Sequence, residues 1–308
     1  MKDNNITPTD YWIQKDKIQE KKAIDLHTHT SYSGGDLSPN ELINLAIKKN
    51  IGILAITDYN TIEGIKELNK SNSTITESGI QIINGIELST SFPRGTLHIL
   101  GYGIDITNTE LNKKMEELKN NTWNHTVSII EQLKKDYNIF FKYDEIKNLM
   151  TKNHTLTTLD IAKLCVKNGY ASSIQEAYEK YLIKANKRIR NINKELSYQS
   201  CIELISNIGG IPVLANPKAL EIPEKEFLVL LKKMINCGLQ GIETYHSEYT
   251  EEEIKYYLAV ANNYNLLTSG GSNYYGPTIN KETTLGDSKN NNIKIKQLSL
   301  LDKLNNQH

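Results

Sequence analysis

Short apolar strands that alternate with helical patterns are the feature that most constrains the fold of this chain. Seven stretches are short and nearly continuously apolar: residues 23–27, 52–57, 79–85, 96–102, 211–216, 239–245 and 265–271. Most of them are followed by apolar residues at helical spacing, as at residues 41–49, where Ser38 and Pro39 are typical of a helix N-cap and first position. Such alternation indicates a parallel sheet covered on both faces. Seven units of this kind predict an α/β protein built as a (β/α) barrel.

The strand pattern stops between about residues 105 and 195. Helical stretches follow one another there, at residues 111–137, 157–168 and 174–183, before strands resume. We therefore predict a barrel interrupted by one helical insertion. The expected division is a leader (1–22), a discontinuous barrel (23–105 and 197–285), a helical insertion (106–196) and a polar C-terminal tail (286–308).

Composition narrows the classes of function. The 36 Lys and Arg residues balance 36 Asp and Glu residues, which argues against a global positive field for long nucleic acid, although a local positive pocket stays open. No apolar run approaches the roughly 18 residues of a membrane helix. Three widely separated cysteines favour reduced, buried thiols, so we expect a cytoplasmic protein without a membrane partner.

Polar residues gather where the predicted strands end, the position that carries the catalytic groups of parallel β/α barrels. These residues are His27, His29, Asp58, Tyr59, Glu87, His98, Asn216, His246 and the pair Ser272-Asn273. Four of the seven histidines fall in this set, a division that chance would rarely produce. We therefore expect the strand ends to form one functional rim.

The tripeptide from His27 to His29 is the sharpest local signal. Alternate residues of an extended segment point the same way, so both imidazoles can reach one metal ion, with Asp25 on the same face to orient a ligand. Two ordinary surface or core histidines are the alternative. Glu87 would bridge metals or pair with a base.

Two further rim residues have a functional and a structural interpretation. His98, on an apolar strand, is either a ligand or a hydrogen-bonded core residue. Asp58 is either a catalytic group or the N-cap of the next helix.

Several motifs in order resemble the PHP (polymerase and histidinol phosphatase) family, in its branch of nucleotide-phosphate phosphoesterases. They read DLHTHT, NGIELST, HILGYG, GGIPVLANP, GIETYHS and TSGGSNYYG, and they span residues 22–105 and 197–285. The resemblance implies a distorted, TIM-like (β/α)7 barrel that holds up to three metal ions. It also implies hydrolysis of phosphate esters by metal-activated water.

The sequence departs from the family at several ligand positions. Gly34, Tyr59 and Tyr275 stand where the family has the aspartate and two histidines of one metal site, so that site is expected to be absent. Asp36 would replace the aspartate only if its loop were reshaped.

The resemblance implies two remaining metal sites, each with weaker ligands than in the family. One would keep His27, His29 and Glu87 with Asn273, and the other would keep Glu87 and His98 with Asn216. Because an asparagine carbonyl is a weaker ligand, we expect one or two divalent ions (Mn, Zn, Fe or Mg) rather than three.

Other rim residues are candidates for the substrate. His246 would act as an acid or phosphate contact, or would be a solvated loop histidine. Arg94 and Lys218 are candidate phosphate contacts. Tyr59 and Tyr275, with Tyr245 and Tyr274, would bring rings to the rim that stack on a base or fill the volume of the missing site.

These observations predict a phosphoesterase with a reduced metal site that hydrolyses a nucleotide or another small phosphate ester. The alternative is a catalytically inactive PHP-fold protein that binds a ligand or a partner through the same rim.

Overall fold

The computed structural model describes residues 22–70, 79–150, 156–189, 196–287 and 295–306. All of the predicted leader except Lys22 lies outside these residues. So do His154 and His308.

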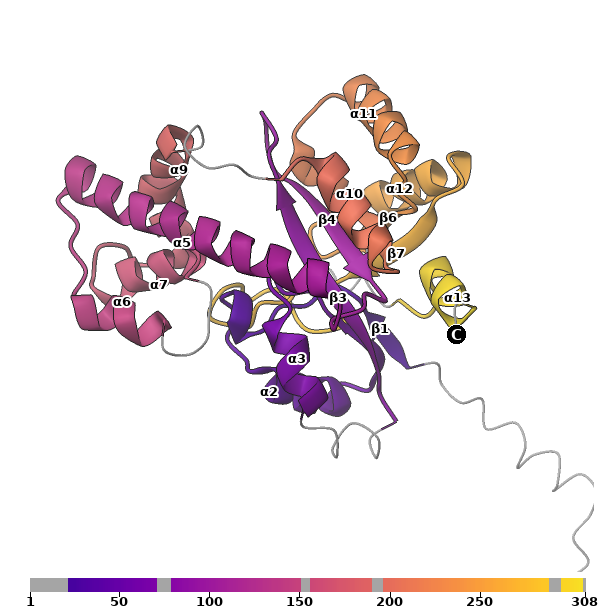
Figure 1. The fold of residues 1–308 in the computed structure, drawn as a ribbon, viewed down its shortest axis with the longest axis horizontal. Helices are drawn as coiled ribbons and strands as arrows, with labels where there is room; N and C mark the ends of the chain where they lie inside the picture. The colour runs from indigo at the N-terminus through magenta and orange to yellow at the C-terminus, as the bar shows by residue number, and fades with distance from the viewer. Residues whose placement is uncertain (1–21, 71–78, 151–155, 190–195, 288–294, 307–308) are drawn as a thin grey trace, which may run out of the picture.

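Seven strands form a single sheet, ordered along the chain as β1 to β7. They are β1 (Ala23–Asp25), β2 (Ile51–Ile56), β3 (Gln81–Thr90), β4 (Leu97–Tyr102), β5 (Ile211–Ala215), β6 (Gly241–His246) and β7 (Leu267–Gly271). The amide of Leu26 donates to the carbonyl of Gly270 at 3.1 Å, which brings the two edges of the sheet together. The expected barrel is therefore confirmed as a seven-stranded sheet that is nearly closed (Figure 1).

The expectation of a uniformly parallel sheet is wrong at β4, which runs antiparallel to both β3 and β5. Residues 91–96 connect β3 to β4 without a helix, whereas a parallel neighbour needs a crossover of about a dozen residues or more. The reversal places the start of β4, with His98, at the rim where the other strands end. β3 also continues to Thr90, so Glu87 lies inside a strand rather than after one.

Helices on the outside of the barrel in the described part of the chain include α2 (Pro39–Lys48), α3 (Glu63–Lys70), α10 (Tyr198–Asn207), α11 (Glu224–Asn236) and α12 (Glu251–Asn263). The predicted start of α2 is confirmed, because the Ser38 side chain accepts from the Glu41 amide and the Glu41 carboxylate accepts from the Ser38 amide. The apolar faces of these helices pack on the outer side chains of the strands in one continuous core.

The C-terminal segment differs from the polar tail that the sequence predicts. α13 (Ser299–Asn305) buries Leu300 and Leu304 in a second core that includes Leu26 and Tyr102 of the barrel interior. The polar residues 288–294 lie outside the described part of the chain. Residues 295–306 therefore pack against the interior of the barrel.

The insertion is helical, as expected. It comprises α5 (Thr109–Tyr137), α6 (Tyr143–Met150), α7 (Thr158–Lys167), α8 (Ile174–Ala177), the π-helical turn η2 (Tyr178–Leu182) and α9 (Ile183–Ile189). Its far half has a core of its own, whereas Leu111, Met115 and Leu118 at the start of α5 join the barrel core. α5 therefore runs from the barrel out into the insertion (Figure 1).

All three cysteines are free; Cys165 and Cys201 are buried, but Cys237 is exposed, so the expectation of buried thiols is wrong for Cys237. Within the described ranges, no helix has both the length and the apolar character needed to cross a membrane.

Tyr102 links three strands inside the barrel. Its hydroxyl donates to the carbonyl of Leu26 at 2.9 Å and accepts from the Ser269 hydroxyl at 3.1 Å. Tyr102→Phe leaves both partners buried without this bond, so we expect the free energy of unfolding to fall by about 1–2 kcal/mol in urea titrations. Tyr143→Phe, at a side chain that is 76% exposed, is the matched control and should change nothing. Equal stability of the two variants would contradict this role of the hydroxyl.

Candidate metal centre

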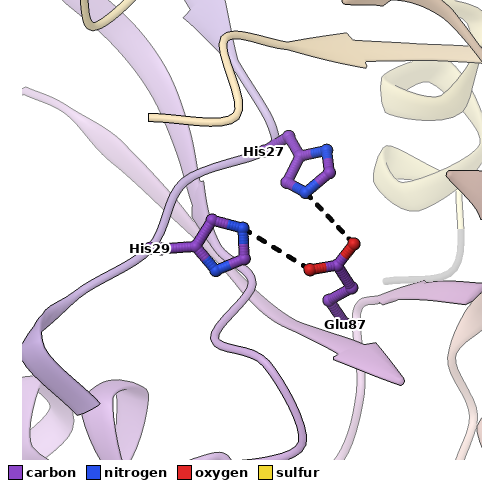
Figure 2. A group of neighbouring side chains, drawn as sticks. All are labelled: His27, His29 and Glu87. Carbon is purple, nitrogen blue, oxygen red and sulfur yellow. Dashed lines mark ion pairs between the residues drawn. The ribbon is translucent and has the colours of Figure 1, made fainter. Parts of the chain in front are cut away.

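One carboxylate, that of Glu87 on β3, faces three imidazoles at the rim. His27 Nε2 lies 3.5 Å from Glu87 Oε1, and His29 Nε2 lies 3.5 Å from Glu87 Oε2 (Figure 2). His98 Nδ1, at the start of β4, lies 2.9 Å from Glu87 Oε1. The structure therefore brings together four residues that lie in or just after three separate predicted strands.

Several buried ligand atoms at the rim, in the described part of the chain, have no hydrogen-bond partner, although two of them lie 3.5 Å from the Glu87 carboxylate. Among the described residues, five buried atoms of rim side chains have no hydrogen-bond partner: His27 Nε2, His29 Nε2, His246 Nε2, Asn216 Oδ1 and Asn273 Oδ1. A buried polar group left without a partner costs about 1–3 kcal/mol, so such a cluster is typical of a site that a ligand completes. The ligand atoms of His27, His29 and Glu87 lie within 4.8 Å of one another. Imidazole and carboxylate together fit a divalent transition metal.

Both asparagines that replace family ligands have left-handed backbones, with φ of 31° at Asn216 and 53° at Asn273. Asparagine tolerates this conformation better than most residues, and such positions gather at functional sites. The pairing of His98 with Ala215 places Asn216 beside the start of β4. The backbone of Asn216 therefore lies beside the strand that carries His98, and a ligand role for both asparagines stays a prediction.

The Glu87 carboxylate is buried and remains charged. Burial alone would raise its pKa, but His98 and His27 outweigh that effect and hold the pKa of Glu87 well below its usual range. A charged carboxylate between imidazoles is the ligand that a divalent cation requires.

Glu243 on β6 is a functional residue that the sequence reasoning missed. It is fully buried; Oε1 lies 2.9 Å from His27 Nδ1, and Oε2 accepts from the Asn216 amide at 2.8 Å. Burial lowers the pKa of His27, but Glu243 and Glu87 outweigh burial and raise it to about 10. A carboxylate behind a histidine fixes the orientation of its ring. The signal in the sequence was a charged residue in the middle of a buried strand.

His29 is held on two sides. Its Nδ1 lies 3.3 Å from the Ser33 hydroxyl, and its ring stacks on Tyr275 with centroids 3.9 Å apart and planes 11° apart. Burial lowers the pKa of His29 to about 3, so the imidazole is neutral, which is the form that binds a metal.

Asp58 and Asp25 hold the loops behind the histidines. Asp58 accepts from the Thr30 amide, the Thr30 hydroxyl and the Ser33 hydroxyl at 2.6–2.7 Å. None of these bonds reaches α3, so the helix N-cap alternative for Asp58 is wrong. Burial raises the pKa of both aspartates. A catalytic role for Asp58 stays a prediction.

Asp25 acts on the loop after β7. Its carboxylate accepts from the amide and hydroxyl of Ser272 at 2.9 and 2.6 Å, and from the amide of Gly286 at 2.8 Å. Its link to His27 is to the backbone amide, at 3.3 Å. Asp25 therefore positions the segment that carries Asn273.

His246 is not the solvated loop histidine that the sequence left open, because its side chain is fully buried. Its ring centroid lies 5.9 Å from that of His27, and its Nδ1 accepts from the Glu248 amide at 3.3 Å. Ligand atoms of His246, His27 and Glu243 form a second group within 4.8 Å. A role as acid or phosphate contact stays a prediction.

The predicted cations lie beside carboxylates. Arg94 Nη1 is 3.2 Å from Glu226 Oε2, and Lys218 Nζ is 2.8 Å from Glu253 Oε1. Exposed pairs of this kind contribute little to stability, and a bound phosphate would have to compete with them. Substrate binding by Arg94 and Lys218 stays a prediction.

The four predicted rim tyrosines separate into two pairs. Tyr275 stacks on His29, and the ring of Tyr59 meets that of His98 edge-on at 5.2 Å. Tyr274 belongs to the barrel core and Tyr245 packs against it, so both side chains have a packing role, and their contribution to the rim stays a prediction. Tyr59 and Tyr275 therefore lie directly beside the candidate ligands, and their substrate roles stay predictions.

The barrel with buried histidines and a carboxylate at its strand ends defines a protein with a candidate divalent-metal site. A sequence model of the PHP domain matches residues 25–208, more than half of the chain, and the chain belongs to that family. The predicted resemblance is confirmed.

Three bacterial relatives match most of the chain. A 5′-3′ exoribonuclease of Haemophilus influenzae is 28% identical, over 83% of this chain and 91% of its own. The Escherichia coli 5′-3′ exoribonuclease Rnm is 28% identical over 82% and 85%. A 3′,5′-nucleoside bisphosphate phosphatase of Chromobacterium violaceum is 24% identical over 82% and 87%.

Solved structures support the fold. A protein of Bifidobacterium adolescentis superposes with a TM-score of 0.77 at 22% identity, over 92% of this chain and 95% of its own. An amidohydrolase of Chromobacterium violaceum superposes with a TM-score of 0.73 at 23% identity, over 83% and 89%. The predicted PHP-type barrel is thereby confirmed.

Glu243→Gln should weaken metal binding without unfolding the protein. Glutamine keeps the volume of Glu243 but removes the charge that orients His27, and loss of such a partner costs about 10–100-fold in metal affinity. Titration of the metal-free protein with Mn²⁺ measures the dissociation constant. Glu117→Gln, at an exposed ion pair with Lys114, is the control. An unchanged constant in Glu243→Gln would show that Glu243 has no part in the site.

Proposed function

We propose that this protein is a divalent-metal-dependent phosphoesterase that hydrolyses a phosphate ester of a nucleotide. The observation that carries the proposal is the set of buried atoms, within the described ranges, without a hydrogen-bond partner: His27 Nε2, His29 Nε2 and Asn273 Oδ1, at the rim where the Glu87 carboxylate lies 3.5 Å from both imidazoles. These contacts are longer than ordinary hydrogen bonds, and a core that needed no ligand would satisfy the buried atoms with closer partners.

His27, His29, Glu87 and Asn273 would hold the first ion. Glu87, His98 and Asn216 would hold a second, more weakly, because their set has one imidazole and a neutral amide oxygen. A bound divalent ion lowers the pKa of water and offsets charge on phosphoryl oxygens. Mn, Zn, Fe and Mg are the candidate metals, in one or two ions rather than three.

Neighbouring side chains would orient the candidate metal ligands. Glu243 holds the ring of His27, Tyr275 covers one face of His29, and Tyr59 lies beside His98. Arg94 and Lys218 remain candidate phosphate contacts, with His246 and Asp58 as candidate proton carriers. Rings locked in this way keep the ligands near one geometry while substrate binds.

The relatives favour a nucleotide substrate, because one of them is a 5′-3′ exoribonuclease and another is a 3′,5′-nucleoside bisphosphate phosphatase. The balanced charge of this chain favours a short substrate over a long nucleic acid. A nucleoside bisphosphate and a short 5′-phosphorylated oligonucleotide are the first two substrates to compare.

His27→Ala combined with Glu87→Ala should remove the activity. The double variant loses two ligands of the first group, so hydrolysis should fall by at least about a hundredfold. Phosphate or nucleotide release is measured after loading with Mn²⁺, Zn²⁺ or Fe²⁺, and elemental analysis gives the bound metal. His125→Ala, a histidine of the insertion that contacts Asn186, is the control.

Two outcomes would contradict the proposal. A wild-type protein that binds no metal and hydrolyses neither substrate would exclude it. Ligand binding that persists in the double variant, without hydrolysis in either protein, would favour the inactive ligand-binding alternative.

A further inference from the structure

One helix of the insertion contacts the loop that follows His29. In α7, Lys163 Nζ donates to the carbonyl of Gly34 at 2.7 Å and lies 3.4 Å from Asp36 Oδ1. A Cβ atom at Gly34 would come within 2.9 Å of the Leu159 side chain, so α7 packs directly on this loop. Gly34 has φ of 93°, which a side chain would also oppose.

Asp36 joins the same loop to the segment after β7. Its amide donates to the Tyr275 carbonyl at 2.7 Å, and its carboxylate accepts from the Thr278 amide at 2.7 Å and from the Thr278 hydroxyl. Gly276 makes this approach possible, since a Cβ there would lie 2.4 Å from Asp36 Oδ2. These bonds occupy Asp36, so it does not replace the missing aspartate ligand.

The two joined segments carry candidate ligands. The His29 amide donates to the Tyr274 carbonyl at 2.9 Å, and the Tyr275 ring stacks on the His29 imidazole. Asn273 immediately precedes these tyrosines. A movement between the two segments would therefore change the position of His29 relative to Asn273.

We propose that Lys163 is a positioning residue for the metal centre, through which the insertion holds the His29 loop and the Asn273 segment together. The ammonium group of Lys163 connects α7 to both Gly34 and Asp36. The Asp36 side chain is only 14% exposed. The inference rests on the proposed function, because positioning has an effect only if the rim binds metal.

Three variants test this role in the full-length protein. Lys163→Met keeps the apolar stem and removes the charge, and Lys163→Arg keeps a donor and the charge. Lys167→Met is the matched control, because Lys167 lies on the same helix but pairs with Glu145 of the insertion.

Three measurements are made on each variant. Hydrogen exchange of the metal-free protein measures the exchange rates of backbone amides in the peptides that cover residues 29–37 and 273–279. Titration with Mn²⁺ gives the dissociation constant, and the visible spectrum of the Co²⁺ form reports ligand geometry.

We expect faster exchange in both peptides, an Mn²⁺ constant about tenfold weaker and an altered Co²⁺ spectrum for Lys163→Met. Lys163→Arg should restore most of the affinity, and Lys167→Met should match the wild type. A merely structural clamp would change the exchange but leave the Mn²⁺ constant and the Co²⁺ spectrum as they are, which would overturn the proposal.

Unchanged exchange in Lys163→Met would also overturn it. Failure of the proposed function has a different signature: the wild-type protein itself would then bind neither Mn²⁺ nor Co²⁺, and a role of Lys163 toward metal would fall with it.

Discussion

The buried charge of Glu87 is the constraint on which the arrangement of the rim depends. A carboxylate that is 4% exposed can stay ionised only if opposite charge or strong hydrogen-bond donors surround it. Imidazoles from two other strand ends meet this need, and one of them, His27, has a second carboxylate behind it. Each of these groups is correctly placed only if the ends of β1, β3 and β6 lie at the same rim as the start of β4. The site and the direction of the strands therefore depend on each other.

The strand periodicity predicted where the sheet would lie, because buried strands are continuous apolar runs whatever their direction. It did not predict the direction of β4, which is decided by a connection too short for a crossover. Glu87, His27 and His29 were predicted because polar residues interrupt apolar surroundings near a strand end. Glu243 was missed because it lies inside a strand rather than near its end. In sequence, a glutamate inside a strand is also compatible with a solvent-facing position, and only the packed barrel shows it behind His27.

The residues that replace family ligands form a connected set. Gly34 lacks a side chain where α7 of the insertion packs, and Tyr275 fills space against His29. An aspartate at Gly34 would have to displace Leu159 and would also oppose the left-handed backbone. If the family has an aspartate ligand here, as the resemblance implies, its absence from this chain and the close packing of the insertion would be two aspects of one arrangement. The sequence alone does not show this contact, because it joins residues more than a hundred positions apart.

The charges at the rim bear on the order in which the proposed metal and phosphate would bind. Arg94, Lys218 and Lys163 each lie beside a carboxylate, and the formal net charge of the chain is +0. Buried Glu87 and Glu243 add negative charge at the rim, which the raised pKa of His27 offsets in part. A phosphate that approaches this rim without metal meets two carboxylates and one cationic imidazole. A divalent ion reverses that balance, so substrate affinity should follow metal occupancy rather than the number of basic side chains.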